Sequence, residues 1–234
     1  EKTLSAGFRS FNLDLMFGLP DQTVSQALED IDRALGFAPP HLSLYQLTIE
    51  SGTPFHKTGV TPPDEDTTAD MFETTQEILT AAGMPAYEIS NHARPGEESR
   101  HNLTCWRGGD YLGIGPGAHG RLNIAGEVYG THQVHNPRRW LQLTREREHG
   151  TAKRRHLEPK ERARALVMMG LRLVEGIDLN RFHAITGMPA DAVLDMDAVI
   201  GLQVEGLIDI SDNSLRATSD GRQRLNAVLA KILG

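Results

Sequence analysis

The first third of the chain alternates between strand-like and helix-like hydrophobic patterns. Residues 8–17 alternate apolar and polar side chains, which predicts a strand. Thr23 and Gln26 form a capping-box pattern, and apolar residues follow it at helical spacing, so a helix is expected from about 24 to 36. The next predicted elements are a strand over 42–49, a helix over about 65–82 and a short strand over 86–91.

This succession of strand, helix, strand, helix and strand is typical of parallel strands joined by right-handed crossovers. Both faces of a parallel sheet are covered, so Asp14 is conspicuous on an otherwise apolar strand. Its carboxylate would contact either a ligand hydroxyl or a structural partner, and both interpretations stay open. Ligands of such sheets bind at the carboxyl ends of the strands. Near those predicted ends lie Asp14, Gly18, Gln46, Thr48 and Glu50.

The middle of the chain is less regular. Residues 92–110 are polar and predict a loop, whereas 120–134 predict a hairpin around an Ala-Gly turn. Residues 137–162 contain nine Lys or Arg against four Glu, a local balance of +5. We interpret this segment as a short helix and a linker, which either meets an anionic ligand or is simply a solvated surface.

Residues 160–234 predict a separate small domain with three helices, a two-stranded wing and a last helix, which is a winged-helix-like order. From residue 156 onward there are nine basic and eleven acidic residues. The predicted third helix, over 189–206, contains four acidic residues and no Lys or Arg. DNA binding is therefore not expected, because few phosphates would be neutralised, and an accessory or interaction module is favoured.

A glycine-rich run, GIGPGA over residues 113–118, formally fits the dinucleotide-binding fingerprint. That fingerprint needs a helix directly after it, whereas Pro116 interrupts the run and a hairpin pattern follows. We reject a dinucleotide site. The run is either a turn that brings backbone close to a ligand or a purely structural glycine turn.

Residues 101–106, HNLTCW, gather an imidazole, an amide, a thiol and an indole. Imidazole and thiolate are both haem axial ligands, and an aromatic ring suits a planar cofactor. The alternative is a packed surface loop anchored by Trp106. Three further histidines, His119, His132 and His135, lack helical zinc-pair spacing and acidic companions, so no metal site is expected there.

Composition narrows these possibilities. The chain has 234 residues, is 39% hydrophobic and 24% charged, and has a net charge of −7, which is typical of a soluble globular protein. Its single cysteine, Cys105, excludes a disulfide framework and any site that needs several thiolates from this chain. A cytoplasmic setting is expected. The chain begins with Glu1 and soon enters a predicted strand, so we interpret it as a fragment.

Several motifs together resemble a known family. Residues 12–23, NLDLMFGLPDQT, resemble the strand-and-turn motif of the radical S-adenosylmethionine (SAM) family around oxygen-independent coproporphyrinogen III oxidase, and residues 44–54, LYQLTIESGTP, look like its next barrel strand. HNLTCW is similar to the H-N-x-x-Y-W motif of the HemW-like haem chaperones of that family. The run after it, GDYLGIGPGAHG over 109–120, also matches, and 160–234 resemble the family's C-terminal helical domain.

The resemblance implies an α/β fold, the later half of a partial (β/α)6 radical SAM barrel plus a small, mostly helical C-terminal domain. By this resemblance, residues 1–135 belong to the barrel, residues 136–159 form a basic helix and a linker, and residues 160–234 form the C-terminal domain. It also implies a [4Fe–4S] cluster held by a C-x3-C-x2-C motif upstream of residue 1, with SAM on the open iron. Cys105 alone cannot build that cluster, so radical chemistry is not expected of this chain by itself.

By the same resemblance, the chain binds haem and hands it to acceptor proteins. His101 would ligate the haem iron, with Cys105, which replaces the motif's tyrosine, and Trp106 nearby. The SAM pocket would include Asp14, Gln46, Thr48, Gly115, Gly117 and His119. No nucleic-acid partner is expected, while a peripheral membrane contact and a homodimer stay open. The second-ranked function is the oxidase itself, which decarboxylates coproporphyrinogen oxidatively but needs the upstream cysteines.

Overall fold

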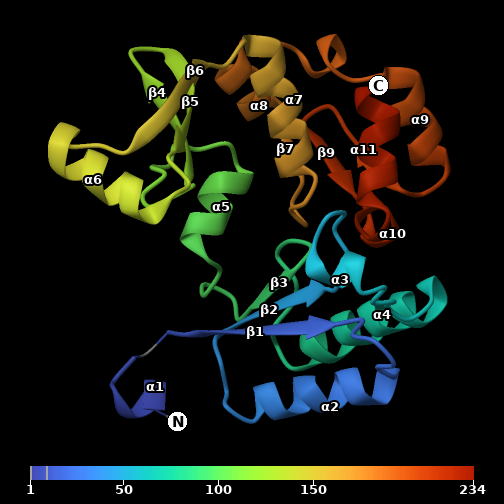
Figure 1. Ribbon diagram of the computed structural model, residues 1–234. Coiled ribbons are helices and arrows are strands. Elements are labelled where there is room, and N and C mark those ends of the chain that lie inside the picture. The colour runs from blue at the N-terminus through green and yellow to red at the C-terminus, as the bar shows by residue number, and fades with distance from the viewer. Residues whose placement is uncertain (1, 9) are drawn as a thin grey trace. The chain divides into compact units, whose positions relative to one another are not determined.

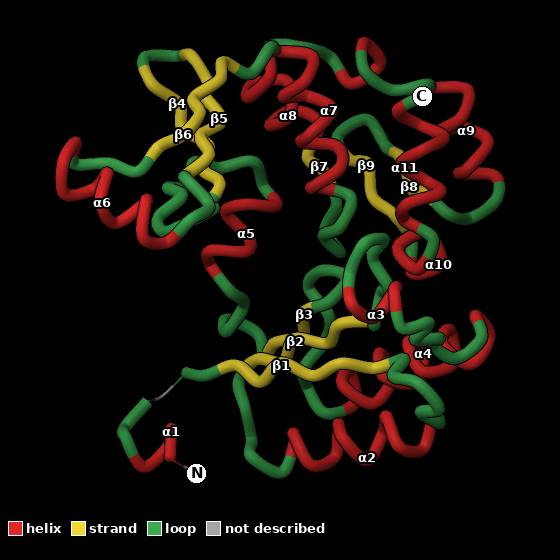
Figure 2. The backbone as a smooth tube through the Cα atoms, viewed as in Figure 1, coloured by secondary structure: helices red, strands yellow, loops and turns green. Residues whose placement is uncertain are grey.

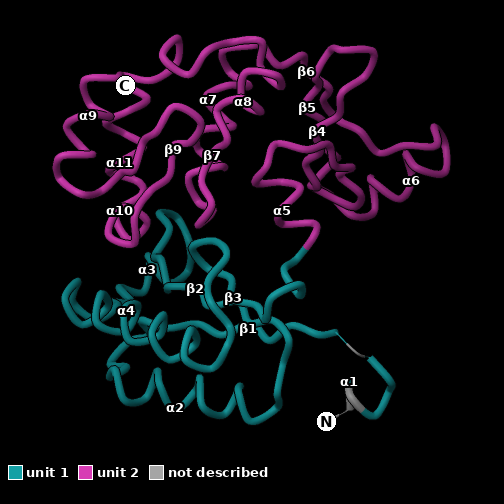
Figure 3. The backbone as a smooth tube through the Cα atoms, turned by 180° about the vertical axis from the view of Figure 1, so that it is seen from behind, with its two compact units in different colours: residues 1–99 teal, residues 100–234 magenta. Residues whose placement is uncertain are grey.

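The computed structural model describes residues 2–8 and 10–234, which divide into unit 1, residues 1–99, and unit 2, residues 100–234 (Figure 3). The boundaries that we predicted at 135 and 160 follow family regions rather than these units, and they stay a prediction. No helix among the described residues is long and apolar enough to cross a membrane.

Unit 1 is built on two parallel strands, β1 (Asn12–Phe17) and β2 (His41–Gln46) (Figure 1). Helices α2 (Val24–Leu35) and α4 (Glu65–Ala81) cover one face of this sheet. Leucines from both strands pack there against Ile31, Leu79 and Met84. Each of these last three residues is no more than 1% exposed. Two short helices complete the unit, α1 (Lys2–Ser5) and α3 (Pro54–Lys57).

The structure confirms the first predicted helix but not the direction of the third predicted strand. Helix α2 begins at the predicted capping box, in which the Thr23 hydroxyl accepts from the Gln26 N–H. The third strand, β3 (Asn91–Ala93), is antiparallel to β2, so our prediction of a parallel strand over 86–91 is wrong. Ala86 forms only an isolated bridge to His92, because the chain after α4 turns back on itself without a crossover.

Unit 2 opens with a helix where we predicted a loop, α5 (Arg100–Trp106). The predicted hairpin is confirmed as β4 (His119–Ile124) and β5 (Glu127–Gln133). After α6 (Pro137–Arg147) comes a strand, β6 (Thr151–His156), in the segment that we expected to be a linker. It pairs antiparallel with β5 and completes a sheet of order β4-β5-β6 (Figure 2).

The rest of unit 2 is mostly helical, as predicted, around a small sheet of order β7-β9-β8. The predicted third helix is split into η1 (Ala190–Ala192) and α9 (Met196–Val204), and the last helix into α10 (Ser219–Gln223) and α11 (Leu225–Leu233). The other elements are α7 (Pro159–Gly170), β7 (Ile177–Asp178), α8 (Leu179–Thr186), β8 (Ile208–Ile210) and β9 (Ser214–Ala217).

Candidate functional site

Helix α5 carries the three predicted haem-site residues, and a glycine follows two residues after its end. Gly108 has a φ of 74°, a backbone conformation that residues with a side chain rarely adopt. A Cβ at this position would lie 2.0 Å from Cδ2 of Leu166 on α7. The chain can therefore leave α5 close to α7 only because residue 108 has no side chain.

His101 and Cys105 lie one turn apart on α5. Nε2 of His101 is 3.8 Å from Sγ of Cys105, a weak sulfur contact. The His101 side chain is exposed, and its ring meets the Tyr111 ring edge-on at a centroid distance of 6.3 Å. Burial raises the pKa of the Cys105 thiol, and the Arg121 charge only partly opposes this. Cys105 is therefore mainly a neutral thiol near pH 7.

Trp106, in contrast, belongs to the interface of α5 with the helical part of unit 2. The Arg172 guanidinium lies 4.7 Å from the centre of its ring. Trp106 also lines a small cavity with Leu166, Phe182 and Ile185. Arg107 beside it forms a two-pronged ion pair with Glu175, with N···O distances of 2.7 and 2.8 Å. The structure thus brings His101 and Cys105 together and assigns Trp106 to anchoring the helix.

Arg121 of β4 is a site residue that sequence reasoning missed. It is 5% exposed, and its Nη2 donates to the carbonyl oxygens of Cys105 and Gly109, both at 3.2 Å. Its guanidinium also lies 5.5 Å from the centre of the Tyr111 ring. One buried cation therefore ties the end of α5 to the glycine-rich loop.

The glycine-rich loop between Tyr111 and His119 folds back on the start of β4. A Cβ at Gly113 would lie 2.5 Å from the His119 carbonyl, and one at Gly117 would lie 2.9 Å from Nδ1 of His135. These two glycines are required by contacts within the chain. Gly115 meets nothing within 4 Å and is required only by its φ of 110°.

The β4–β5 hairpin and the loop that follows it bring the rings of three histidines together. His119 and His132 are cross-strand partners, and their rings stack at a centroid distance of 4.2 Å. The His135 ring meets that of His132 at 4.6 Å. Burial and the neighbouring histidines lower the pKa of His132. Among the described residues, no group of three or more His, Cys, Asp or Glu side chains could hold a metal ion.

In unit 1 the predicted SAM residues separate onto different faces. Asp14 lies on the open face of the sheet, where its Oδ1 accepts from Nδ2 of Asn12 at 2.6 Å. Nδ2 of Asn12 also donates to the Ser43 hydroxyl, and Oδ1 of Asn12 lies 2.7 Å from Nδ1 of His41. Gln46 is the register partner of Phe17, on the face opposite to Asp14, at the carboxyl ends of both strands.

Thr48 follows β2 and is exposed. Asp14, Gln46 and Thr48 thus belong to unit 1, and Gly115, Gly117 and His119 belong to unit 2. A common SAM pocket therefore stays a prediction. Burial lowers the pKa of His41, although the Asp14 and Glu98 charges oppose it, so this imidazole is mainly neutral near pH 7.

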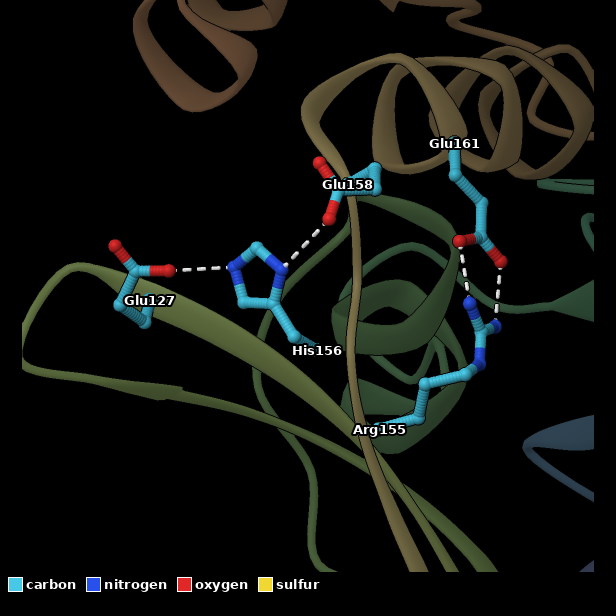
Figure 4. Close-up of polar contacts among 5 residues, drawn as sticks. All are labelled: Glu127, Arg155, His156, Glu158 and Glu161. Atoms are coloured by element: carbon cyan, nitrogen blue, oxygen red, sulfur yellow. Dashed lines mark hydrogen bonds and ion pairs between the residues drawn. The ribbon is translucent and has the colours of Figure 1, made fainter.

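The end of β6 is fastened to α7 by ion pairs (Figure 4). Arg155 pairs with both carboxylate oxygens of Glu161, at 2.5 and 2.6 Å. His156 lies between Glu127 and Glu158, with N···O distances of 2.5 and 3.2 Å. A hydrogen bond to Glu158, followed by the hydrogen bond and charge of Glu127, raises the pKa of His156.

The chain is similar to known proteins over nearly all of its length. Residues 157–224 match the HemN C-terminal domain family. The chain is 39% identical to the haem chaperone HemW of Escherichia coli and 37% identical to that of Haemophilus influenzae, covering 97% of this chain and 58% of each relative. It is 35% identical to the mouse mitochondrial radical S-adenosyl methionine domain-containing protein 1, over 95% of this chain and 52% of that protein.

Among solved structures, coproporphyrinogen III oxidase (HemN) from Escherichia coli superposes with a TM-score of 0.75 at 19% identity, covering 97% of this chain and 56% of that one. At 19% sequence identity, this match shows similarity of fold and nothing further. The fold is therefore that of a part of the solved HemN structure, and its C-terminal region matches the HemN C-terminal domain family. Over nearly all of its length the chain is similar to HemW haem chaperones, and it spans a little over half the length of these curated relatives.

Proposed function

We propose that this chain carries the haem-binding surface of a haem chaperone and that His101 ligates the haem iron. The observation that carries this proposal is an exposed imidazole beside an exposed apolar loop. His101 meets the ring of Tyr111, and the loop after that tyrosine holds Leu112, 67% exposed, and Ile114, 78% exposed. A porphyrin needs an axial ligand together with an apolar surface for its face, and these residues supply both.

The contact between His101 and Cys105 limits how they could share one iron. Two axial ligands approach an iron from opposite faces of the porphyrin, and the ring must fit between them. Nε2 and Sγ are 3.8 Å apart in direct contact, which leaves no room for a macrocycle. The raised pKa of Cys105 also leaves little thiolate for coordination. We therefore assign ligation to His101 and an orienting contact to Cys105.

Transfer of haem to acceptor proteins follows from the name of the relatives and is part of this proposal. An exposed ligand on a surface helix suits a carrier, because an acceptor can approach the bound haem directly. SAM and a [4Fe–4S] cluster would belong to the full-length protein, with the cluster cysteines outside this chain. Asp14, Gln46 and Thr48, together with Gly115, Gly117 and His119, stay the proposed SAM contacts.

Titration of haemin into the purified chain tests the assignment of His101. We expect a saturable Soret shift for the unaltered chain and for His183→Ala, an exposed histidine of α8 in the same unit. The shift should be lost or weakened about tenfold or more in His101→Ala, since removing the axial ligand removes the metal bond. Equal binding by His101→Ala and His183→Ala would refute ligation by His101.

A Cys105→Ser variant separates the two neighbouring side chains. Because the thiol is assigned an orienting role, this variant should keep haem binding and change only the position of the Soret band. Loss of binding in Cys105→Ser with retention in His101→Ala would make the sulfur the ligand instead.

A further inference from the structure

We propose that the edge of strand β6 is a docking site for an acidic, extended segment of a partner protein, which adds to the β4-β5-β6 sheet as a further strand. The proposal is independent of haem binding and concerns a surface that none of the predicted site residues occupies. It rests on three features of the described residues, namely an available strand edge, local positive charge and an adjoining hollow.

The edge is available because β6 is the last strand of its sheet and pairs only with β5. Apart from those ladder bonds, the backbone of residues 152–156 makes no hydrogen bond among the described residues. Residues 152–155 are all exposed, and the strand contains no proline. Outward-facing N–H and C=O groups in such an edge are a template for another strand.

Charge selects an acidic occupant. The whole chain has a net charge of −7, yet β6 contains Lys153, Arg154 and Arg155 in succession and no acidic residue. Arg155 is already neutralised by Glu161, as Figure 4 shows. Lys153 and Arg154 have no ion pair within the described part of the chain. Two cations along one edge therefore remain for carboxylates of an incoming strand.

A hollow beside the edge of β6 can bind apolar side chains of the partner segment. It has a volume of about 400 Å³, and its lining includes Leu122, Ile124 and Tyr129. Its lining also includes His149, Lys153 and Arg154, and none of the described acidic residues lines it. The Arg154 guanidinium lies 4.1 Å from the centre of the Tyr129 ring, so this side chain lies against an apolar residue of the same hollow.

These features together specify the pattern of the partner segment. Successive side chains of a strand point to opposite faces of its sheet. One set of alternate residues would then reach the apolar hollow, on the face that Arg154 shares with Tyr129, while carboxylates of the other set meet Lys153 on the opposite face. A basic strand would be repelled, which also protects this edge from pairing with a second copy of itself.

The test uses the whole chain without haem and a fluorescein-labelled, eight-residue peptide of alternating Val and Glu. We expect saturable binding that weakens about tenfold or more in the double variant Lys153→Glu and Arg154→Glu. The milder pair Lys153→Gln and Arg154→Gln should weaken binding less. The matched control, Arg138→Glu and Arg145→Glu on α6, changes the net charge equally outside the hollow and should alter binding by less than about threefold.

Hydrogen exchange distinguishes strand addition from simple charge attraction. On peptide binding, outward-facing amides among residues 152–156 should exchange more slowly, and peptides with alternate N-methyl groups should lose binding in one of the two registers. The proposal is overturned if the amides show no added protection, or if an alternating Val and Lys peptide binds equally well. Binding of anionic vesicles or single-stranded RNA at Lys153 and Arg154, without binding of the peptide, would also overturn it.

Discussion

At the residue scale, the single thiol reports directly on the packing of the proposed haem helix. Burial raises the pKa of Cys105 more than the nearby Arg121 charge lowers it. The rate of alkylation by iodoacetamide should therefore rise with pH around a midpoint above that of the urea-unfolded chain. Because Cys105 is the one cysteine of the sequence, the signal has no other source. A midpoint equal to or below the unfolded value would show that the thiol is more accessible to water or cations than this packing allows.

His156 links residue chemistry to pH. Glu158 and Glu127 favour its protonated form, so its folded pKa should lie above 6.5 in a nuclear magnetic resonance titration. Since the folded pKa is raised, the stabilisation is complete below the unfolded value and is lost as pH rises through the folded value. Replacing Glu158 or Glu127 by Gln should lower the pKa, and replacing Glu29 of α2 should leave it unchanged. An unaltered His156 pKa in both variants would contradict the contacts in Figure 4.

At the scale of elements, the end of α5 depends on a glycine for two separable reasons. Gly108→Ala would place a methyl group 2.0 Å from Leu166 and would also strain the backbone at positive φ. Gly126→Ala in the β4–β5 turn is the matched control, because it has a positive φ and nothing within 4 Å. Urea unfolding should show Gly108→Ala to be less stable than this control by about 1–3 kcal/mol, from overpacking. Equal losses would mean that α5 can move away from α7 at no cost.

The elements also show where a sequence pattern stops being informative. Helix α2 was predictable because its capping box and apolar spacing are local. Strand β6, TAKRRH, has no apolar alternation and exists because β5 offers it a partner, so its own residues could not reveal it. Helix α5 has seven mostly polar residues and owes its position to Arg121 and α7. The direction of β3 depends on how the chain returns after α4, which hydrophobicity does not encode.

The stacking of His119 on His132, in contrast, could have been predicted from the sequence. The predicted hairpin turns at Ala125 and Gly126, and a two-residue turn fixes the cross-strand register. Counting outward from that turn pairs residue 124 with 127 and His119 with His132. His135 joins them through the loop after β5, which the pattern alone does not describe.

At the scale of the whole molecule, the residues of the haem proposal lie on one unit, whereas the proposed SAM contacts lie on both. Asp14, Gln46 and Thr48 stand on unit 1, which follows the barrel-like succession of parallel strands and covering helices. The haem proposal draws only on unit 2, in which Arg121, the Arg107–Glu175 ion pair and Trp106 hold α5 in place. The haem proposal is therefore separate from unit 1, although three of the six proposed SAM contacts also lie on unit 2.

This separation predicts that residues 100–234 bind haem without unit 1. His101, Tyr111, Leu112 and Ile114 all lie within that stretch, and so do the side chains that position them. Once circular dichroism and cooperative unfolding show that the shortened chain is folded, its haemin affinity should lie within about threefold of that of the whole chain, since no contact of the proposed site is removed. His101→Ala in the shortened chain should abolish the shift. A folded 100–234 chain that binds haemin far more weakly would mean that unit 1 contributes to the haem site, and the surface around His101 would then be only part of it.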